Sequence, residues 1–494
     1  MIQGKTSESF QTKATAGIIW SAFERFGQQG VGFLVQLILA RILAPEQFGL
    51  IAMVAVFVAL CQGIVDAGFH EAIIQKKELD DSLISTVFFT NLLLSFLLAG
   101  GLWVGAPLVS DFYDQPLLTA LLRVLCLGLL IDGLARIQLT LLQREMLFRK
   151  LATATLVASV LSGIVAVALA LSGAGVWALV WQILLQRLFV AIMFWMQSPW
   201  RPQWLYSIKS LKEVLPFSLR MFASNFLNTI FQQIYVLVIG RVGSPVDLGY
   251  YQRADSFKRL ASNTSNTLMS RVTFPLFAQV QDDLARLRRG FIKASQLLGF
   301  LFFPFMAVLA AVAEPLIVTL IGEKWLPAVP YLQLLCIIGA LHPVHAINLS
   351  LLKALGQARL FLRLELVKKS VIVMVLLVTF RHGAYMIVVG QLFSSLLALC
   401  INGFFTHRLI KISYFQQLKM YVGSVILSIF VACAVSELLL LYVAAAPLRL
   451  ISALVLASVL WPLGVWLLRG IFTVELDWFF GELARLPWIK KKAV

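Results

Sequence analysis

Long runs of apolar residues, separated by short polar segments, organise the whole chain. Most of the runs approach or exceed the roughly 20 residues that a helix needs to cross a hydrocarbon layer of about 30 Å. They are continuous and do not alternate in ten-residue segments, which favours helices over a membrane β-barrel. The pattern predicts about fourteen spans, the eighth of them unusually polar, near residues 14–40, 47–65, 82–108, 117–139, 151–171, 176–196, 216–240, 248–277, 291–321, 331–352, 365–381, 384–405, 421–443 and 448–468.

The composition agrees with a membrane protein. Of the 494 residues, 60% are hydrophobic and only 13% are charged, and the mean hydropathy is +0.88. A soluble chain of this length would carry roughly a quarter of charged residues. The first span is too long for the apolar part of a cleavable signal peptide, so we expect none. The predicted fold class is an all-α integral membrane protein.

Positive charge is distributed unevenly between alternate loops. If the N-terminus lies in the cytoplasm, the inner loops hold most of the lysines and arginines outside the spans, and the outer loops hold little more than Arg41, Arg241, Lys324, Arg381 and Arg449. This asymmetry follows the positive-inside rule and predicts that both termini are cytoplasmic. It also accounts for most of the net charge of +17, so we do not expect binding to nucleic acid.

The chain contains an internal duplication with an offset of about 200 residues. ARILAPEQFGL at 40–50 matches GRVGSPVDLGY at 240–250, with Arg41, Pro45 and Gly49 falling on Arg241, Pro245 and Gly249. APLVSDFYDQP at 106–116 matches EPLIVTLIGEKWLP at 314–327, and LTLLQREMLFR at 139–149 matches LSLLKALGQAR at 349–359. Duplicated halves are common in transporters, where the substrate path runs between them.

The duplication predicts the domain organisation. The first and seventh spans both start inside, so the two six-helix bundles should be parallel repeats. We expect an N-terminal lobe over 1–200, a C-terminal lobe over 201–410, and two additional helices with a basic cytoplasmic tail over 411–494.

Several kinds of chemistry find no support in the sequence. The five cysteines, all inside apolar spans, are expected to be small hydrophobic residues and not disulfides or metal ligands. No GxxxxGK[ST] phosphate loop is present. His342 and His345 lie one turn apart, where polar packing is favoured over a ligand or proton role. We expect no cofactor, no metal and no enzymatic activity.

Charged residues inside predicted spans are costly in lipid and are therefore candidates for function. The cations are Arg25, Arg123, Arg136, Arg187, Arg220, Arg253, Lys258, Arg259 and Arg271, and the anions are Glu24, Asp132, Asp255 and Glu314. With a rise of about 1.5 Å per residue, Arg25, Arg187, Lys258 and Arg259 fall near the midplane. An electropositive interior of this kind suits an anion such as a phosphate or diphosphate.

A structural role is open for some of these residues. Asp132 and Arg136 are four residues apart, as are Asp255 and Arg259, so each pair has the spacing of a salt bridge on one helix face. For Arg25, Arg187 and Lys258 a functional role is favoured, because no local partner is evident. Glu24, Asp255 and Glu314 are candidates for coupling to an ion gradient.

Uncharged polar residues extend the predicted lining. Gln28, Gln29, Asn225, Gln232, Gln233 and Asn263 lie in the first, seventh and eighth spans. Such groups suit a hydroxyl-rich substrate, although hydrogen bonds between helices would also explain many of them.

Several motifs resemble those of a known family. LARILAPEQFGL after the first span, DAGFHEAIIQ at 66–75, LGYYQRAD at 248–255, FPLFAQVQDD at 274–283 and GEKWLPAVPYL at 322–332 are similar to motifs of bacterial polysaccharide exporters of the multidrug/oligosaccharidyl-lipid/polysaccharide (MOP) superfamily. The resemblance covers nearly the whole chain and is strongest to the colanic-acid and O-antigen type of lipid-linked oligosaccharide flippase.

The resemblance implies a cationic cavity that opens alternately to either side of the bacterial inner membrane. Its implied cargo is an undecaprenyl-diphosphate-linked oligosaccharide, a repeat unit of exopolysaccharide or O-antigen. Arg220 and Arg271 would meet the diphosphate first, and Arg25, Arg187 and Lys258 or Arg259 would then hold it; Arg123 and Arg253 complete the predicted cationic set. The expected partners are the lipid-linked glycan, membrane lipid and a polysaccharide polymerase, and the duplicated chain is expected to work as a monomer.

Two other transporter functions stay open at this point. A lipid II flippase would also need cations and fourteen helices. A multidrug antiporter of the same superfamily shares the twelve-helix core, but an acidic cavity would suit its cationic substrates better.

Overall fold

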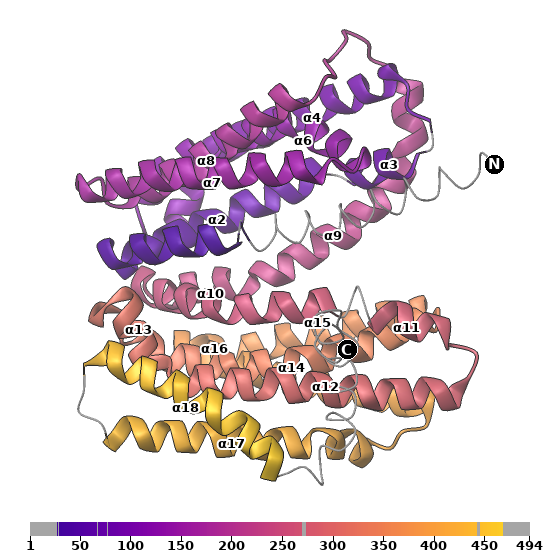
Figure 1. The fold of residues 1–494 in the computed structure, drawn as a ribbon. Helices are drawn as coiled ribbons and strands as arrows, with labels where there is room; N and C mark the ends of the chain where they lie inside the picture. Colours follow the sequence, from indigo (N-terminus) through magenta and orange to yellow (C-terminus); the bar gives the residue numbers. More distant parts are fainter. Residues whose placement is uncertain are drawn as a thin grey trace, which may run out of the picture. The chain divides into compact units, whose positions relative to one another are not determined.

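The computed structural model describes residues 27, 29–66, 68–76, 78–268, 273–441 and 445–467, and all regular structure in these ranges is helical. Glu24, Arg25, Gln28 and Arg271 lie outside the described residues. The chain divides into two compact units, Met1–Gly249 and Tyr250–Val494. Figure 1 colours their helices along the sequence.

The first unit consists of long helices joined by short turns. It begins with an apolar helix over Gln29–Ile42. The helices that follow are α2 (Pro45–Asp66), α3 (Phe69–Gln75), α4 (Asp81–Tyr113), α5 (Leu117–Leu125), α6 (Leu127–Arg144), α7 (Phe148–Leu171), α8 (Val176–Gln197) and α9 (Ile208–Val242).

The second unit has a similar content of helices. Helix α10 (Pro245–Leu268) begins in the first unit and continues into the second. It is followed by α11 (Phe274–Gln279), α12 (Leu284–Ala311), α13 (Ala313–Ile321), η2 (Glu323–Trp325), α14 (Ala328–Ala354), α15 (Ala358–Thr379), η3 (Phe380–His382), α16 (Ala384–Ile410), α17 (Tyr414–Leu441) and α18 (Ala446–Leu467).

Within the described ranges, eleven helices are long and apolar enough to cross a membrane. The shorter apolar helix Gln29–Ile42, α10 and α15 coincide with the other predicted spans. Helices α10 and α15 are richer in charge, which lowers their hydropathy. Fourteen crossings are therefore compatible with this structure.

The predicted span 291–321 differs in detail from the structure. Helix α12 ends at Ala311, and Ala313–Ile321 forms the separate helix α13. Because α12 alone has 28 residues, it is about 42 Å long and already exceeds the hydrocarbon thickness. The apolar residues of α13 are therefore not needed to complete the crossing.

Helix α6 lies at the centre of the first unit and packs against α4, α8 and α3. One apolar cluster fixes the small helix α3 between its neighbours. In it, Phe69 and Ile73 of α3 are buried with Val87 of α4, Ile137 of α6 and Val214 of α9. This packing holds the end of α2 and the start of α3 beside α6.

The two copies of the proline–glycine motif contact each other reciprocally within residues 1–249. Pro45 and Pro245 are the first residues of α2 and α10, a position that suits the fixed backbone angle of proline. The carbonyl of Pro245 lies against the Cα of Gly49, and the carbonyl of Pro45 lies against the Cα of Gly249, so that neither glycine has room for a Cβ atom. The residues that the sequence repeat aligned therefore form one symmetric contact.

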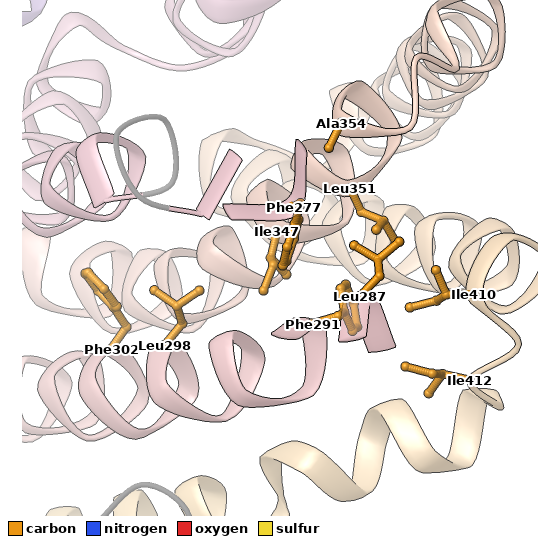
Figure 2. Packing of buried hydrophobic residues seen from close by; sticks show 10 residues of the cluster. All are labelled: Phe277, Leu287, Phe291, Leu298, Phe302, Ile347, Leu351, Ala354, Ile410 and Ile412. Atoms are coloured by element: carbon orange, nitrogen blue, oxygen red, sulfur yellow. The ribbon is translucent and has the colours of Figure 1, made fainter. Parts of the chain in front are cut away.

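The second unit has its own apolar core. Figure 2 shows Phe277 of α11 and Phe291 of α12 facing Ile347 and Leu351 of α14, and all four are at most 2% exposed. The C-terminal pair packs outside this core, with α17 along α12 and α18 against α13 and α17. Buried apolar side chains of α17 and α18 pack together there, including Leu427, Val431 and Ala453.

The spatial and the sequence boundaries of the halves differ. Helix α9, which opens the second copy of the repeat, packs against α2, α3 and α4 in the first unit. The spatial division therefore falls at residue 249, whereas the lobes predicted over 1–200 and 201–410 follow the repeat. That division into lobes stays a prediction.

The cysteines are free, as predicted. Cys126 and Cys336 are buried and Cys61 is half-buried, while Cys400 and Cys433 are exposed on their helices.

Candidate functional site

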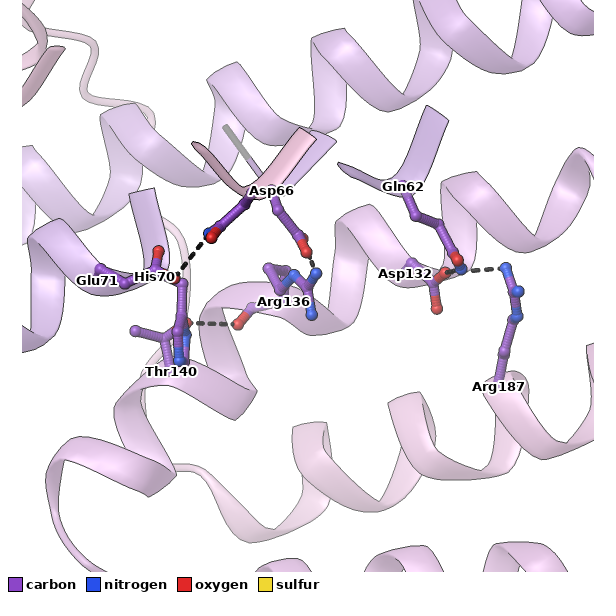
Figure 3. Close-up of polar contacts among 9 residues, drawn as sticks. Gln62, Asp66, His70, Glu71, Asp132, Arg136, Thr140 and Arg187 are labelled. Atoms are coloured by element: carbon purple, nitrogen blue, oxygen red, sulfur yellow. Dashed lines mark hydrogen bonds and ion pairs between the residues drawn. The ribbon is translucent and has the colours of Figure 1, made fainter. Parts of the chain in front are cut away.

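Three helices of the first unit direct polar side chains toward one another in an otherwise apolar bundle. Figure 3 shows these side chains, which come from α2, α6 and α8, together with residues of α3. They form two ion pairs, at Arg187 and Arg136, and a polar group around His70. We call this set of residues the unit 1 polar site: Gln62, Asp66, His70, Glu71, Asp132, Arg136, Thr140, Arg187 and Asn225.

The first ion pair joins the middle of α8 to α6. Nη1 of Arg187 lies 2.9 Å from Oδ2 of Asp132, and Nε2 of Gln62 donates a hydrogen bond of 2.6 Å to the same oxygen. The side chains of Arg187 and Asp132 are 20% and 31% exposed. Both charged groups are therefore partly accessible, although they lie inside membrane-spanning helices.

Gly128 of α6 makes room for the Arg187 side chain. A Cβ atom at this position would lie 2.7 Å from Nη1 and 3.2 Å from Cδ of Arg187, well inside normal contact distance. The absence of a side chain at residue 128 therefore allows the guanidinium to cross α6 and reach Asp132.

The second ion pair lies about one helical turn along α6. Arg136 pairs with Asp66, the last residue of α2. After Asp66 the chain turns through Gly68, which has a left-handed backbone with φ of 72°. The turn packs against α9, because a Cβ atom at residue 68 would meet the backbone of Ser218. Glycine at this position thus places Asp66 and α3 beside α6.

Helix α3 extends the polar row beyond Arg136. Nδ1 of His70 lies 2.8 Å from Oγ1 of Thr140, and this hydroxyl donates to the Arg136 carbonyl at 2.9 Å. Nδ2 of Asn225 donates to Oε1 of Glu71 at 3.4 Å. The row can thus offer guanidinium groups for an anion, and amide and hydroxyl groups for a polar ligand.

One expectation about pairing changes in this geometry. Asp132 and Arg136 have the spacing of a helix-face salt bridge, yet Asp132 pairs with Arg187 and Arg136 pairs with Asp66. The reason is that side chains of α8 and α2 reach these residues across the bundle. Gln62 and Asp66 were not among the predicted site residues. The signals for them in the sequence were their polarity at the end of an apolar span and, for Asp66, its position as the first residue of the DAGFHEAIIQ motif.

The second unit contains a separate cluster of charges on α10. Asp255 is 2% exposed and pairs with Arg259, as the four-residue spacing predicted. It also pairs with Lys258, whose Nζ lies 2.5 Å from Oδ1 of Asp255. Lys258, for which we expected no local partner, therefore has one three residues away.

Two other predicted residues of the second unit have different surroundings. Arg253 is 4% exposed, and its guanidinium carbon lies 5.7 Å from the centre of the Trp325 ring. Glu314 is exposed in the first turn of α13. His345, for which polar packing was favoured, contacts Ser395 and Asn402 of α16 at 3.0 and 3.3 Å.

The remaining predicted residues of the first unit do not join the polar site, except Asn225. Arg123 stacks on Trp103, 4.4 Å from the ring centre. Arg220 is exposed and donates to the Pro216 carbonyl. Gln29 and Gln233 are half-buried and Gln232 is exposed. Asn263, of the second unit, lies on α10 in a stretch whose side chains are not described.

Together, the apolar helices and the polar site within them define a multi-pass membrane protein. A family model described as "Polysaccharide biosynthesis protein" matches residues 38–330. This is more than half of the chain, which therefore belongs to the polysaccharide biosynthesis protein family.

Two relatives agree with this family, and one solved structure is similar in fold. The chain is 29% identical to the succinoglycan biosynthesis transport protein ExoT of Rhizobium meliloti (strain 1021), over 78% of this chain and 77% of that one. It is 26% identical to the lipopolysaccharide biosynthesis protein WzxC of Escherichia coli (strain K12), over 84% and 83%. A solved structure of the lipid II flippase MurJ, in an inward closed conformation, is similar in fold. Its TM-score is 0.72 at 14% identity, covering 92% of this chain and 100% of MurJ.

Proposed function

We propose that this protein is a flippase that carries a polyprenyl-diphosphate-linked oligosaccharide across the bacterial inner membrane. The cargo is a repeat unit of a surface polysaccharide, and the carrier lipid is undecaprenyl diphosphate. Membership of the polysaccharide biosynthesis protein family supports this class of cargo. So do the relatives named for succinoglycan transport and lipopolysaccharide biosynthesis.

The observation that carries the proposal is the position of Arg187 in the unit 1 polar site. A charged side chain in the middle of a membrane-spanning helix is costly and usually functional, and Arg187 remains 20% exposed although it is paired with Asp132. Guanidinium groups bind phosphate oxygens through two parallel hydrogen bonds. Arg187 of α8, and Arg136 one turn along α6 from Asp132, would therefore receive the diphosphate of the lipid.

The neighbouring polar groups suit the glycan. The amides of Gln62 and Asn225 can donate to and accept from sugar hydroxyls, while the polyprenyl chain stays in lipid. Alternating exposure of this head-group site to the two faces of the membrane would complete the transfer. The diphosphate must leave on the outer side, so its binding has to be moderate.

The cations near α10 and those outside the described residues keep the roles that the sequence suggested. Lys258 and Arg259 would contact the head group during transfer, and Arg25 and Arg271 stay candidates for binding the diphosphate on sequence grounds. We also propose that both termini lie in the cytoplasm and that the chain works as a monomer.

A cell-based assay tests this function. Lipid-linked oligosaccharide on the cytoplasmic face is measured for wild type, Arg187→Ala and Lys258→Ala, with expression matched by blotting; Arg25→Ala is added on sequence grounds. The matched control is Arg241→Ala, which removes an arginine from an exposed ion pair with Asp114. The site variants should trap glycan inside and lose surface polysaccharide, whereas Arg241→Ala should export it. Normal export by all the site variants would remove these cations from the transport path.

No observation favours lipid II as the cargo. The sequence identity to MurJ is 14%. At this level the similarity supports a common fold and says nothing about the cargo.

A further inference from the structure

The two arginines of the unit 1 polar site are matched by an equal number of carboxylates. Arg187 is paired with Asp132, and Arg136 is paired with Asp66. This part of the site is therefore close to neutral in the present arrangement. A diphosphate that binds here has to compete with carboxylates that already occupy the guanidinium groups.

We propose that the unit 1 polar site binds the diphosphate together with a proton, which Asp132 takes up when the phosphate replaces it on Arg187. The proton comes from water and joins the carboxylate to give a neutral carboxyl group. This inference rests on the proposed function. It adds that binding of the diphosphate depends on pH.

Electrostatics provides the first reason. A phosphate on Nη1 of Arg187 would lie next to Oδ2 of Asp132, because these atoms are 2.9 Å apart. Two anions so close inside a bundle repel each other strongly, and a nearby like charge favours the neutral form of a carboxyl group. Protonation of Asp132 removes the repulsion and releases the guanidinium to the phosphate.

Gln62 provides the second reason, because its amide can hold either form of Asp132. With the carboxylate ionised, Nε2 of Gln62 donates to Oδ2 of Asp132 at 2.6 Å. If the carboxyl group is protonated, rotation of the amide presents Oε1, which accepts the new O–H. The neutral acid is therefore not left without a partner when Arg187 turns to the ligand.

The other charges around Asp132 are few within the described residues. Arg187 faces it from α8, Arg136 follows one turn along α6, and Asp66 lies beyond on α2. His70 and Glu71 of α3 lie farther along the row. The charged residues of α4 and α7 are at the helix ends, and Arg123 of α5 stacks on Trp103. Arg187 is thus the cation on which the charge of Asp132 depends most directly.

Linkage gives the measurable consequence. If binding takes up one proton, the affinity for the diphosphate rises by up to tenfold for each pH unit lowered, and binding of the proton is favoured by the ligand to the same extent. The diphosphate itself titrates in this range, as phosphate groups have a pKa near 6. Comparison with a variant that cannot be protonated at residue 132 separates proton uptake by Asp132 from proton uptake by the diphosphate.

The experiment is isothermal titration calorimetry of the full-length protein in nanodiscs with farnesyl diphosphate, from pH 6 to 8. Repeating each titration in buffers of different ionisation enthalpy gives the number of protons taken up. Wild type should take up about one proton more than Asp132→Asn, whose binding should be tighter at pH 8 and depend less on pH. Asp114→Asn, which changes the exposed pair with Arg241, is the matched control and should behave as wild type.

A second measurement uses wild type alone, so it does not depend on whether a variant folds. Infrared difference spectra of wild type should show a protonated carboxyl band when farnesyl diphosphate is added, and none when farnesol is added. Inorganic diphosphate should give the same band at higher concentration, because the inferred site holds the head group alone.

Three results would overturn the inference. They are equal proton uptake by wild type and Asp132→Asn, no carboxyl band in wild type, or no binding of farnesyl diphosphate at any of these pH values. The proposed function is judged separately, since it fails only if glycan still reaches the outer face in cells without this protein.

Discussion

Arg187 of α8 and Asp132 of α6 are 55 positions apart in the chain, and their side chains form an ion pair of 2.9 Å. The pair has Gln62 of α2 on the same carboxylate oxygen, so three helices meet at one polar point. Gly128 of α6 provides the space through which the arginine reaches it. This contact therefore combines bundle packing with the charge that the proposed transport requires.

Removing one partner of this pair should destabilise the protein. We expect Arg187→Ala to cost about 1–3 kcal/mol, below the range of about 3–5 kcal/mol for fully buried pairs because both side chains are partly exposed. The double variant Arg187→Leu with Asp132→Leu should recover most of the melting temperature of the purified protein, yet should not export glycan. A double variant as unstable as Arg187→Ala would contradict the stabilising role of the ion pair. A double variant that exports normally would contradict its role in transport.

Filling the space beside Arg187 should impair transport more than folding. In Gly128→Ala the new methyl group would meet the Arg187 side chain, whose closest atom would be 2.7 Å away. The flexible arginine can move, so we expect a loss of at most about 1–3 kcal/mol in stability and at least a tenfold slower export. Gly100→Ala in α4 is the matched control, because no atom lies within 4 Å of a Cβ at that residue. Equal export by the two variants would show that the position of Arg187 is not critical.

Asp255 should be among the most important residues for stability in the second unit. Its carboxylate is 2% exposed and neutralises both Lys258 and Arg259. Asp255→Ala would leave Lys258, whose side chain is 14% exposed, without its carboxylate in the interior, at a cost of about 3–5 kcal/mol, whereas Arg259 is 55% exposed and adds little. Asp114→Ala, which breaks the exposed pair with Arg241, should cost about 0–1 kcal/mol. Melting temperatures of the two purified variants decide this, and similar shifts would count against a structural role for the α10 cluster.

The orientation predicted from the loop charges can be tested by chemical labelling. In a variant whose five native cysteines are replaced by alanine, Ser172→Cys lies in the turn after α7, and Glu145→Cys lies in the turn after α6. Both positions are exposed. In intact cells, a membrane-impermeant maleimide should label residue 172 and should label residue 145 only after lysis. The opposite pattern would place the termini outside.

Much of the fold could be predicted from the sequence, because each span is determined locally. A helix in lipid needs a run of about 20 apolar residues whatever its neighbours are, and most of the predicted spans match helices of the structure. The repeat also identified residues that meet in space, since Pro45 and Gly249, and Pro245 and Gly49, form reciprocal contacts. The ion pair of Asp255 with Arg259 was predictable because both residues lie on one helix face.

The candidate site was only partly predictable, because its contacts cross between helices. The sequence established that Arg187, Asp132 and Arg136 were charged groups within membrane spans. Which carboxylate neutralises which arginine depends on the packing of α2, α6 and α8, and packing replaced the helix-face pair with two contacts across the bundle. Gln62 and Asp66 became site residues only through that packing. Local hydrophobicity therefore determined the helices. The tertiary structure decided which charges are paired, because Coulomb energy inside a bundle depends on distances of a few ångströms that no spacing along the chain records.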